Sequence, residues 1–379
     1  MVLKSISRQG FILLILSIIF LTVGCSNSDS DTVTSSNTSS NSSVSSNTGA
    51  GSTENNSGVV STIAGSGSAG NANGIGTEAS FFGPYGVTID SAGNIIIADL
   101  FNNLIRKIDS DGVVTTIAGS GSQGSADGTG TAASFYQPNG VTIDSNGNII
   151  VTDQRNNLIR KIDSDGVVTT IAGTGSAGNA NGTGTAASFN YPTGVAIDSA
   201  GNIIVADYFN HLIRKIDSDG VVTTIAGTGS AGSADGTGTA ASFNRPAGVA
   251  TDSAGNIIVT GWGSNLIRKI DSDGVVSTIA GTGSAGSANG IGTEASFNGP
   301  YKVAIDGAGN IIVAELLGNL IRKIDSEGVV TTIAGSGSAG SDNGTGTAAS
   351  FGYPAGVAID SAGNIIVTDI NNYLIRKIQ

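Results

Sequence analysis

The sequence predicts an all-β fold, a six-bladed β-propeller, from three observations. The tetrapeptide Ile-Arg-Lys-Ile occurs six times, and each copy follows the last by 54 residues without drift. Every repeat contains four short runs of β-branched residues separated by turn signals. A fixed period near 50 residues with four strands per unit is typical of propeller blades. The arginines of the six copies are Arg106, Arg160, Arg214, Arg268, Arg322 and Arg376.

The repeat at residues 190–227 shows how each blade is built. We expect strands at 192–198, 202–207, 212–217 and 221–226, because Val, Ile and Thr dominate these runs. Asn, Asp, Ser and Gly separate the runs and provide the turns. Apolar residues on both faces of the strands suit sheets that are stacked between neighbouring sheets. The prediction is a four-stranded antiparallel blade.

The first and last strands of the repeat region predict how the ring closes. Residues 59–64 form a lone fourth strand, whereas the chain ends after a third strand at 373–378. We therefore expect the N-terminal strand to complete the last blade. This closure removes the open sheet edge that would otherwise favour aggregation.

The repeat resembles the NHL repeat over residues 58–379. The resemblance rests on Pro-x-Gly-Val-Ala-Ile-Asp-Ser-x-Gly-Asn-Ile-Ile-Val-x-Asp, followed by Asn-x-Leu-Ile-Arg-Lys-Ile, and on the glycine-rich segment that precedes it. It implies a six-bladed propeller. Members of that family bind proteins, peptides, RNA or sugars, and a few relatives are enzymes. The resemblance therefore implies a scaffold and not a reaction.

Two repeats depart from the pattern at the end of the second strand. Four repeats have aspartate there, but the fourth has Gly261 and the fifth has Glu315. If this aspartate pairs with the third-strand arginine, Arg268 has lost its partner. We then expect the fourth blade to be the loosest at this point. The four aspartates are Asp99, Asp153, Asp207 and Asp369.

The N-terminal 57 residues predict export and a membrane anchor. Residues 1–24 combine two basic residues with a short apolar run, as in a secretory signal peptide. The run Leu21-Thr-Val-Gly-Cys25 resembles a lipobox, so Cys25 is the expected lipidation site; the alternative is an ordinary signal peptide with an incidental cysteine. Residues 25–57 are rich in Ser and Asn and predict a disordered tether. The propeller then occupies 58–379.

Composition argues against one class of partner. The net charge is −12, and the isoelectric point is about 4.3. Nucleic-acid binding depends on Lys and Arg that neutralise phosphates, so we expect no nucleic-acid partner. The single cysteine excludes an intramolecular disulfide.

Three features of the sequence could be taken for a dinucleotide, metal or catalytic site, but their details argue against each. Each repeat has Gly-x-Gly-x-x-Gly, but no amphipathic helix follows it, so a glycine loop is the better interpretation than a dinucleotide site. Asp-Ser-Asp-Gly lacks the later ligands of a calcium loop and predicts a hairpin turn, with weak calcium binding as an alternative. His211 is the only histidine, which argues against zinc or a catalytic triad. We expect no cofactor, no metal and no catalytic residue.

The positions at which the repeats differ predict the binding surface. In a four-stranded blade, the second–third and fourth–first connections lie on one face of the disc, and most of the variation falls in them. Aromatic and basic residues gather there, which is typical of recognition surfaces, although neutral drift in loops is the alternative. The expected ligand-binding residues are Tyr85, Phe101, Tyr136, Arg155, Tyr191, Tyr208, Phe209, His211, Arg245, Trp262, Tyr301, Lys302 and Tyr353, with Leu316 and Leu317 beside them.

These observations predict a monomeric, exported, lipid-anchored scaffold of the bacterial cell envelope that binds a protein, peptide or glycan. We do not expect an enzyme. Two alternatives remain open from the sequence. One is a propeller hydrolase or lyase with a central carboxylate or calcium site, and the other is a structural surface protein without a specific ligand.

Overall fold

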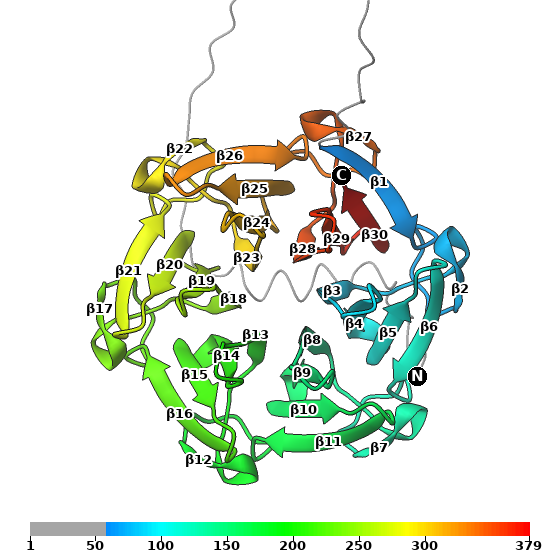
Figure 1. Cartoon of the computed structure of the whole chain (residues 1–379), viewed down its shortest axis with the longest axis horizontal. Coiled ribbons are helices and arrows are strands. Elements are labelled where there is room, and N and C mark those ends of the chain that lie inside the picture. Colours follow the sequence, from blue (N-terminus) through cyan, green and yellow to red (C-terminus); the bar gives the residue numbers. More distant parts are fainter. Residues whose placement is uncertain (1–57) are drawn as a thin grey trace, which may run out of the picture. The chain divides into compact units, whose positions relative to one another are not determined.

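The computed structural model describes residues 58–379, which form six sheets arranged in a ring (Figure 1). This confirms the predicted six-bladed propeller. The predicted signal peptide (1–24), the lipidation site Cys25 and the tether (25–57) lie outside the described residues. Within residues 58–379, no helix combines the length and the hydropathy that crossing a bilayer requires.

The four predicted strands of each blade lie side by side, and the first of them is nearest the centre of the ring (Figure 1). The innermost strands are β3 (Pro84–Ile89), β8 (Pro138–Ile143), β13 (Pro192–Ile197), β18 (Pro246–Thr251), β23 (Pro300–Ile305) and β28 (Pro354–Ile359). The second strands are β4 (Ile95–Asp99), β9 (Ile149–Asp153), β14 (Ile203–Asp207), β19 (Ile257–Gly261), β24 (Ile311–Glu315) and β29 (Ile365–Asp369). Blades 1 to 6 are numbered in the order of these strands.

The outer strands carry the repeated tetrapeptide and the segment that follows it. The third strands are β5 (Leu104–Ile108), β10 (Leu158–Ile162), β15 (Leu212–Ile216), β20 (Leu266–Ile270), β25 (Leu320–Ile324) and β30 (Leu374–Ile378). The fourth strands are β6 (Val113–Ala118), β11 (Val167–Ala172), β16 (Val221–Ala226), β21 (Val275–Ala280), β26 (Val329–Ala334) and β1 (Val59–Ala64). All neighbouring pairs are antiparallel; in blade 3, for example, Val205 pairs with Arg214.

The expectation of four strands per blade is wrong by one, because each glycine-rich connection adds a two-residue strand to the outer edge. These strands are β2 (Gly74–Ile75), β7 (Gly128–Thr129), β12 (Gly182–Thr183), β17 (Gly236–Thr237), β22 (Gly290–Ile291) and β27 (Gly344–Thr345). Each one pairs with the beginning of the fourth strand of the next blade in the chain, as β7 does with β11. The fourth–first connection therefore descends along the rim instead of staying on one face.

Short 3-10 helices complete the connections. Those after the fifth strands are η1 (Gly76–Glu78), η3 (Gly130–Ala132), η5 (Gly184–Ala186), η7 (Gly238–Ala240), η8 (Gly292–Glu294) and η9 (Gly346–Ala348). Those between the second and third strands are η2 (Leu100–Asn102), η4 (Gln154–Asn156) and η6 (Tyr208–Asn210) in blades 1 to 3. No long helix follows the glycine motif, as expected for a loop.

The ring closes as predicted. Strand β1 pairs with β30, so the first described strand completes the sheet that contains the last one. Val60 lies opposite Ile378 in this pair. The closed ring leaves no unpaired edge between the first and last repeats.

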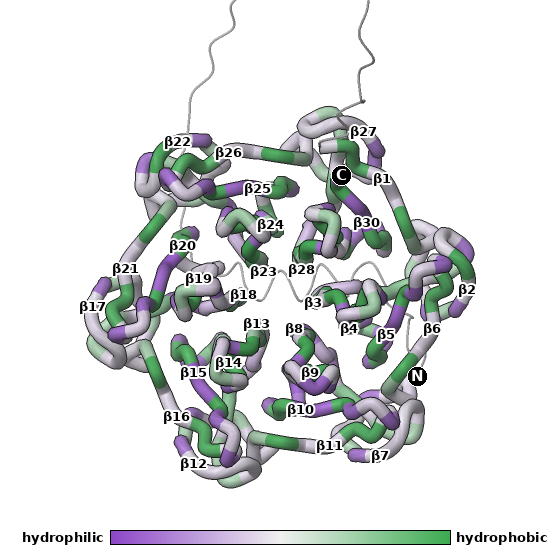
Figure 2. Tube along the Cα trace, viewed as in Figure 1, coloured by the Kyte–Doolittle hydropathy of each residue, from purple (hydrophilic) through white to green (hydrophobic). Residues whose placement is uncertain are grey.

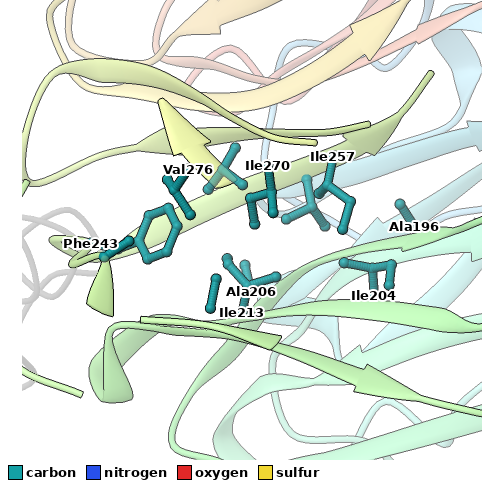
Figure 3. Packing of buried hydrophobic residues seen from close by; sticks show 12 residues of the cluster. Ala196, Ile204, Ala206, Ile213, Phe243, Ile257, Ile270 and Val276 are labelled. Atoms are coloured by element: carbon teal, nitrogen blue, oxygen red, sulfur yellow. The ribbon is translucent and has the colours of Figure 1, made fainter. Parts of the chain in front are cut away.

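The apolar core lies between adjacent blades (Figure 3). Between blades 3 and 4, Ile204, Ala206 and Ile213 of one blade face Ile257 and Ile270 of the next. The other blade interfaces contain the equivalent residues. Because each blade buries both faces against its neighbours, its strands are apolar on both sides, as the sequence pattern indicates.

The repeated arginine of the tetrapeptide, here called the pin arginine, is buried inside each blade. Arg214 is fully buried, and its guanidinium lies 5.2 Å from the ring of Phe189. It donates to Asp207 at 3.0 Å and to the backbone oxygens of Ala180 and Ser188 in the glycine-rich connection. Figure 2 shows the hydrophilic segment inside third strands such as β15 and β25. The arginine therefore ties the connection to the sheet, which explains its repetition.

The predicted pairing of this arginine with the second-strand carboxylate is confirmed in five blades. In blade 4, where Gly261 replaces the aspartate, Arg268 pairs with Asp235 at 2.7 Å instead. Burial lowers the pKa of Arg268, and the charge of Asp235 opposes this shift. Asp235 is half exposed, so blade 4 has replaced a buried ion pair by a partly solvated one.

A second set of contacts joins the innermost strands of adjacent blades. Thr260 accepts a hydrogen bond from the N–H of Gly248 in its own blade and donates to the backbone oxygen of Tyr301 in the next. Thr152 and Thr368 do the same in blades 2 and 6. Blades 1, 3 and 5 have alanine at this position: Ala98, Ala206 and Ala314.

We expect Thr260→Ala to lower the free energy of unfolding by about 1–3 kcal/mol, because it leaves a buried N–H and a buried carbonyl without this hydroxyl. Chemical denaturation measures the change. Thr260→Ser, which keeps the hydroxyl, is the control and should recover most of the loss. Equal losses in the two variants would show that the methyl group, and not the hydrogen bonds, is responsible.

Candidate ligand-binding face

The second–third loops and the ends of the fourth–first connections meet on one face of the ring, here called the variable face. Backbone hydrogen bonds hold the two kinds of loop together within each blade. In blade 3, for example, the N–H of Phe209 donates to the backbone oxygen of Asn190. The rigid scaffold thus fixes the positions at which the repeats differ.

The centre of the variable face is an aromatic cluster, here called the tyrosine plug, in which Tyr208 and Tyr301 are buried and Tyr85 is partly buried. The plug packs against Ala247 of blade 4, Leu316 of blade 5, and Ala355 and Ile370 of blade 6. The rings of Tyr85 and Tyr301 lie 5.7 Å apart in an edge-on arrangement. Burial raises the pKa of all three phenols. They are neutral packing groups at ordinary pH.

Tyr301 links opposite sides of the ring. Its hydroxyl oxygen lies 2.9 Å from Nδ2 of Asn139, which belongs to blade 2, whereas Tyr301 belongs to blade 5. Blades 2 and 5 face each other across the centre (Figure 1). The side chain of Tyr301 therefore reaches across the central channel at the variable face.

Beside the plug lies a continuous stack of cationic and aromatic side chains, here called the arginine–aromatic row: Tyr136, Arg155, Tyr191, Phe209, Arg245 and Trp262. The Arg155 guanidinium lies 5.7 Å from the ring centres of both Tyr136 and Tyr191. The Arg245 guanidinium lies 5.9 Å from Phe209 and 5.6 Å from Trp262. Tyr191 and Phe209, 4.9 Å apart, join the two halves.

The two arginines of this row differ from the buried arginines of the blades. Each pin arginine pairs with a carboxylate, but neither Arg155 nor Arg245 forms an ion pair within residues 58–379. Nε of Arg155 donates to the side-chain oxygen of Gln137 at 3.1 Å, which orients the guanidinium. Arg155 is exposed, and Arg245 is partly exposed. A guanidinium that lies beside aromatic rings can still donate its N–H groups to another partner.

His211 is part of the scaffold beneath this row. Its Nδ1 accepts a hydrogen bond from the N–H of Arg245 at 3.0 Å. Asn157 does the same for Tyr191 in the preceding blade, through its side-chain oxygen. Burial lowers the pKa of His211, and the charge of Arg245 adds to this effect. His211 is thus a loop variant that keeps the role of the asparagine.

The structure places all the predicted binding residues at the variable face or at the channel beneath it, but it does not leave all of them accessible. Arg155 and Phe209 are exposed, Tyr208, Tyr301 and Lys302 are buried, and Tyr85, Phe101, Tyr136, Tyr191, His211, Arg245, Trp262 and Tyr353 are intermediate. Phe101 forms a separate pair with Phe82 on blade 1, 5.0 Å between ring centres. The sequence could not separate the plug from the more accessible row, because exposure depends on which loops meet at the centre.

The opposite face carries the nearly constant turns. Asp217, for example, accepts hydrogen bonds from the N–H groups of Asp219 and Val221, which confirms the predicted hairpin turn. In the part of the chain that the structure describes, no three His, Cys, Asp or Glu side chains are placed to hold a metal ion.

Comparisons with known proteins find NHL repeats in three of the six blades. The NHL repeat model matches residues 135–162, 189–216 and 351–378. A search of curated proteins finds no match. Among solved structures, a Bacteroides thetaiotaomicron protein of unknown function has a TM-score of 0.67 at 20% identity, over 84% of this chain and 75% of that one.

Two further structures share the fold. An auxiliary nutrient binding protein from Bacteroides ovatus has a TM-score of 0.66 at 17% identity, over 85% of this chain and 76% of its own. A gluconolactonase from Xanthomonas campestris has a TM-score of 0.55 at 14% identity, over 79% of this chain and 86% of its own. The TM-scores show a common fold, and at these low identities the likeness says nothing further about function.

Proposed function

We propose that this chain, an NHL-repeat six-bladed propeller, is a binding scaffold whose arginine–aromatic row recognises a protein, peptide or glycan. The observation that carries the proposal is the pair of stacked arginines without carboxylate partners. Guanidinium groups held between aromatic rings are pre-oriented, so binding a ligand costs them little conformational entropy. Aromatic and arginine side chains also dominate the binding energy of known interfaces.

The charge of the row favours ligands that carry carboxylates. The chain has a net charge of −12, yet both guanidiniums of the row lie on the variable face without a carboxylate partner. Arginine binds carboxylates through two parallel hydrogen bonds, and the neighbouring rings offer apolar surface. An acidic peptide segment or a glycan with acidic sugars fits both features.

We propose that the protein acts at the cell envelope. The lipobox at Cys25 and the polar tether 25–57 favour an exported protein held at a membrane by acyl chains. The nutrient binding protein from Bacteroides ovatus shares the fold, which is compatible with a binding role for a propeller of this kind. An enzyme with a central carboxylate has less support, because the six innermost strands contain neither Asp nor Glu.

A triple variant tests the proposal without disturbing the fold, because each replacement is the residue that another repeat has at the same position. Arg155→Asn copies Asn371, Arg245→Gly copies Gly299, and Trp262→Leu copies Leu316. We expect the full-length protein to bind members of a glycan array or an acidic-peptide array, and the triple variant to lose at least 90% of that binding. Calorimetry with the selected probe measures the loss.

The matched control lies on the same face but outside the row. Phe101→Leu with Tyr373→Asn also uses residues from other repeats and removes the aromatic contacts of Phe82. This control should bind like the wild type. Equal binding by the triple variant, or no binding of any probe by the wild type, would contradict the proposal.

A further inference from the structure

Lys302 is the one exception in a set of six equivalent positions, one in each innermost strand, that are otherwise glycine. It lies in the innermost strand β23, and the other five innermost strands have glycine at this position: Gly86, Gly140, Gly194, Gly248 and Gly356. A side chain on any of these glycines would collide with the backbone of an adjacent innermost strand. Lys302 is therefore the only one of the six positions that places a side chain beside the channel.

The side chain of Lys302 lines a small cavity in the channel. The cavity has a volume of about 50 Å³, room for more than one water-sized molecule. Its walls are the glycines of blades 1, 2, 3 and 6 and the six valines that follow these positions: Val87, Val141, Val195, Val249, Val303 and Val357. The valines and Lys302 each retain 5–8% exposure, so a molecule in the cavity can touch them.

No carboxylate accompanies this amine. On the six innermost strands the only titratable side chains are Tyr85, Tyr301 and Lys302 itself. Nζ of Lys302 lies 3.2 Å from the backbone oxygen of Ala247 and 5.1 Å from the ring centre of Tyr301. Glu315, at the end of the adjacent strand β24, is already paired with Arg322.

We propose that Lys302 is an amine nucleophile that captures a small neutral carbonyl compound in the central channel as an imine. The lone pair of Nζ attacks the carbonyl carbon and forms a C–N bond. The carbonyl oxygen then leaves as water with the two amine protons, so that aldehyde and amine give imine and water. Hydrolysis reverses the step, and no oxidant or metal is required.

The surroundings favour a neutral carbonyl compound over an anion. The end of the channel opposite the variable face is ringed by the aspartates that follow the innermost strands: Asp90, Asp144, Asp198, Asp252, Asp306 and Asp360. Six carboxylates at this end repel anions but not uncharged aldehydes or ketones. The tyrosine plug closes the other end. The walls of glycine and valine offer apolar contact to a short carbon chain.

Burial supports the same reactivity. It lowers the pKa of Lys302 from 10.5 to about 7, because an ammonium without a counter-charge is poorly solvated in the channel. A lysine desolvated in an apolar pocket is nucleophilic at neutral pH, since much of it carries a free lone pair.

Reductive trapping tests the proposal, and the repeats supply internal controls. The full-length protein is treated with acetaldehyde and sodium cyanoborohydride at pH 7, and N-ethylation is followed by peptide mass spectrometry. The controls are the tetrapeptide lysines Lys107, Lys161, Lys215, Lys269, Lys323 and Lys377. We expect Lys302 to react at least tenfold faster than each of them, and the advantage to shrink toward pH 10, where ordinary lysines also lose their proton.

The variant Lys302→Gly gives the central channel the residue of the other five blades. It should lose the fast phase of ethylation while the six control lysines react as before. Lys302 reacting no faster than the controls at pH 7 overturns the proposal. So does a fast phase that persists in Lys302→Gly, because the reactive amine would then lie elsewhere.

Discussion

Replacing Asp207 by alanine is expected to lower the free energy of unfolding by about 3–5 kcal/mol, because it leaves the fully buried Arg214 without its charged partner. Asp207 also accepts hydrogen bonds from the N–H of Asn190 and from the side chain of Asn210. Burial raises the pKa of Asp207 to about 6, so denaturation at pH 8 compares variants in which the carboxylate is ionised.

The repeats provide a matched comparison for this effect. Asp153→Ala removes the equivalent carboxylate in blade 2, but Arg160 there keeps a second partner, Asp127, at 2.8 Å. In blade 3 the corresponding neighbour of Arg214 is the uncharged Asn181. Asp153→Ala should therefore cost less than Asp207→Ala, and adding Asp127→Asn should remove the difference. Equal losses in the two single variants would show that the second carboxylate does not matter.

Lys302 is expected to make stability depend on pH in a way that Lys302→Met abolishes. The pKa falls from 10.5 to about 7 on folding, so between these values the unfolded chain binds more protons than the folded one. The contribution of Lys302 to the free energy of unfolding therefore rises as the pH increases from 7 to 10.5. The difference in unfolding free energy, wild type minus Lys302→Met, should increase by about 3 kcal/mol from pH 7 to pH 10.

Denaturation at several pH values measures this difference, and the subtraction cancels groups that titrate equally in both proteins. Below about pH 6, where Lys302 is protonated in both the folded and the unfolded chain, the two curves should run parallel, with Lys302→Met the more stable. A difference that stays constant from pH 7 to pH 10 would mean that Lys302 keeps an ordinary pKa in the folded protein.

Most of the fold follows from the sequence because its information is local and repeated six times. The predicted strands of the third repeat agree with β13, β14, β15 and β16 to within one residue at each end. The fifth strand was missed because it has only two residues, such as Gly182 and Thr183, and glycine is a poor signal for a strand.

The arrangement of the variable face was predictable only in outline. Variation between repeats located the loops correctly, but not the depth at which each side chain lies. Tyr208 and Phe209 are adjacent and equally aromatic, yet the first is buried in the plug and the second is exposed. The contact of Arg245 with Trp262 joins two different loops, and no spacing in the sequence predicts it. Such contacts arise when the ring brings loops together.

A crystal structure of the protein with its array-selected peptide or glycan would show whether the arginine–aromatic row holds the ligand. We expect a ligand carboxylate within hydrogen-bonding distance of the Arg155 or Arg245 guanidinium, with apolar parts of the ligand against Phe209 or Trp262. A ligand bound at the aspartate turns of the opposite face, or on the rim formed by the fifth strands, would contradict it.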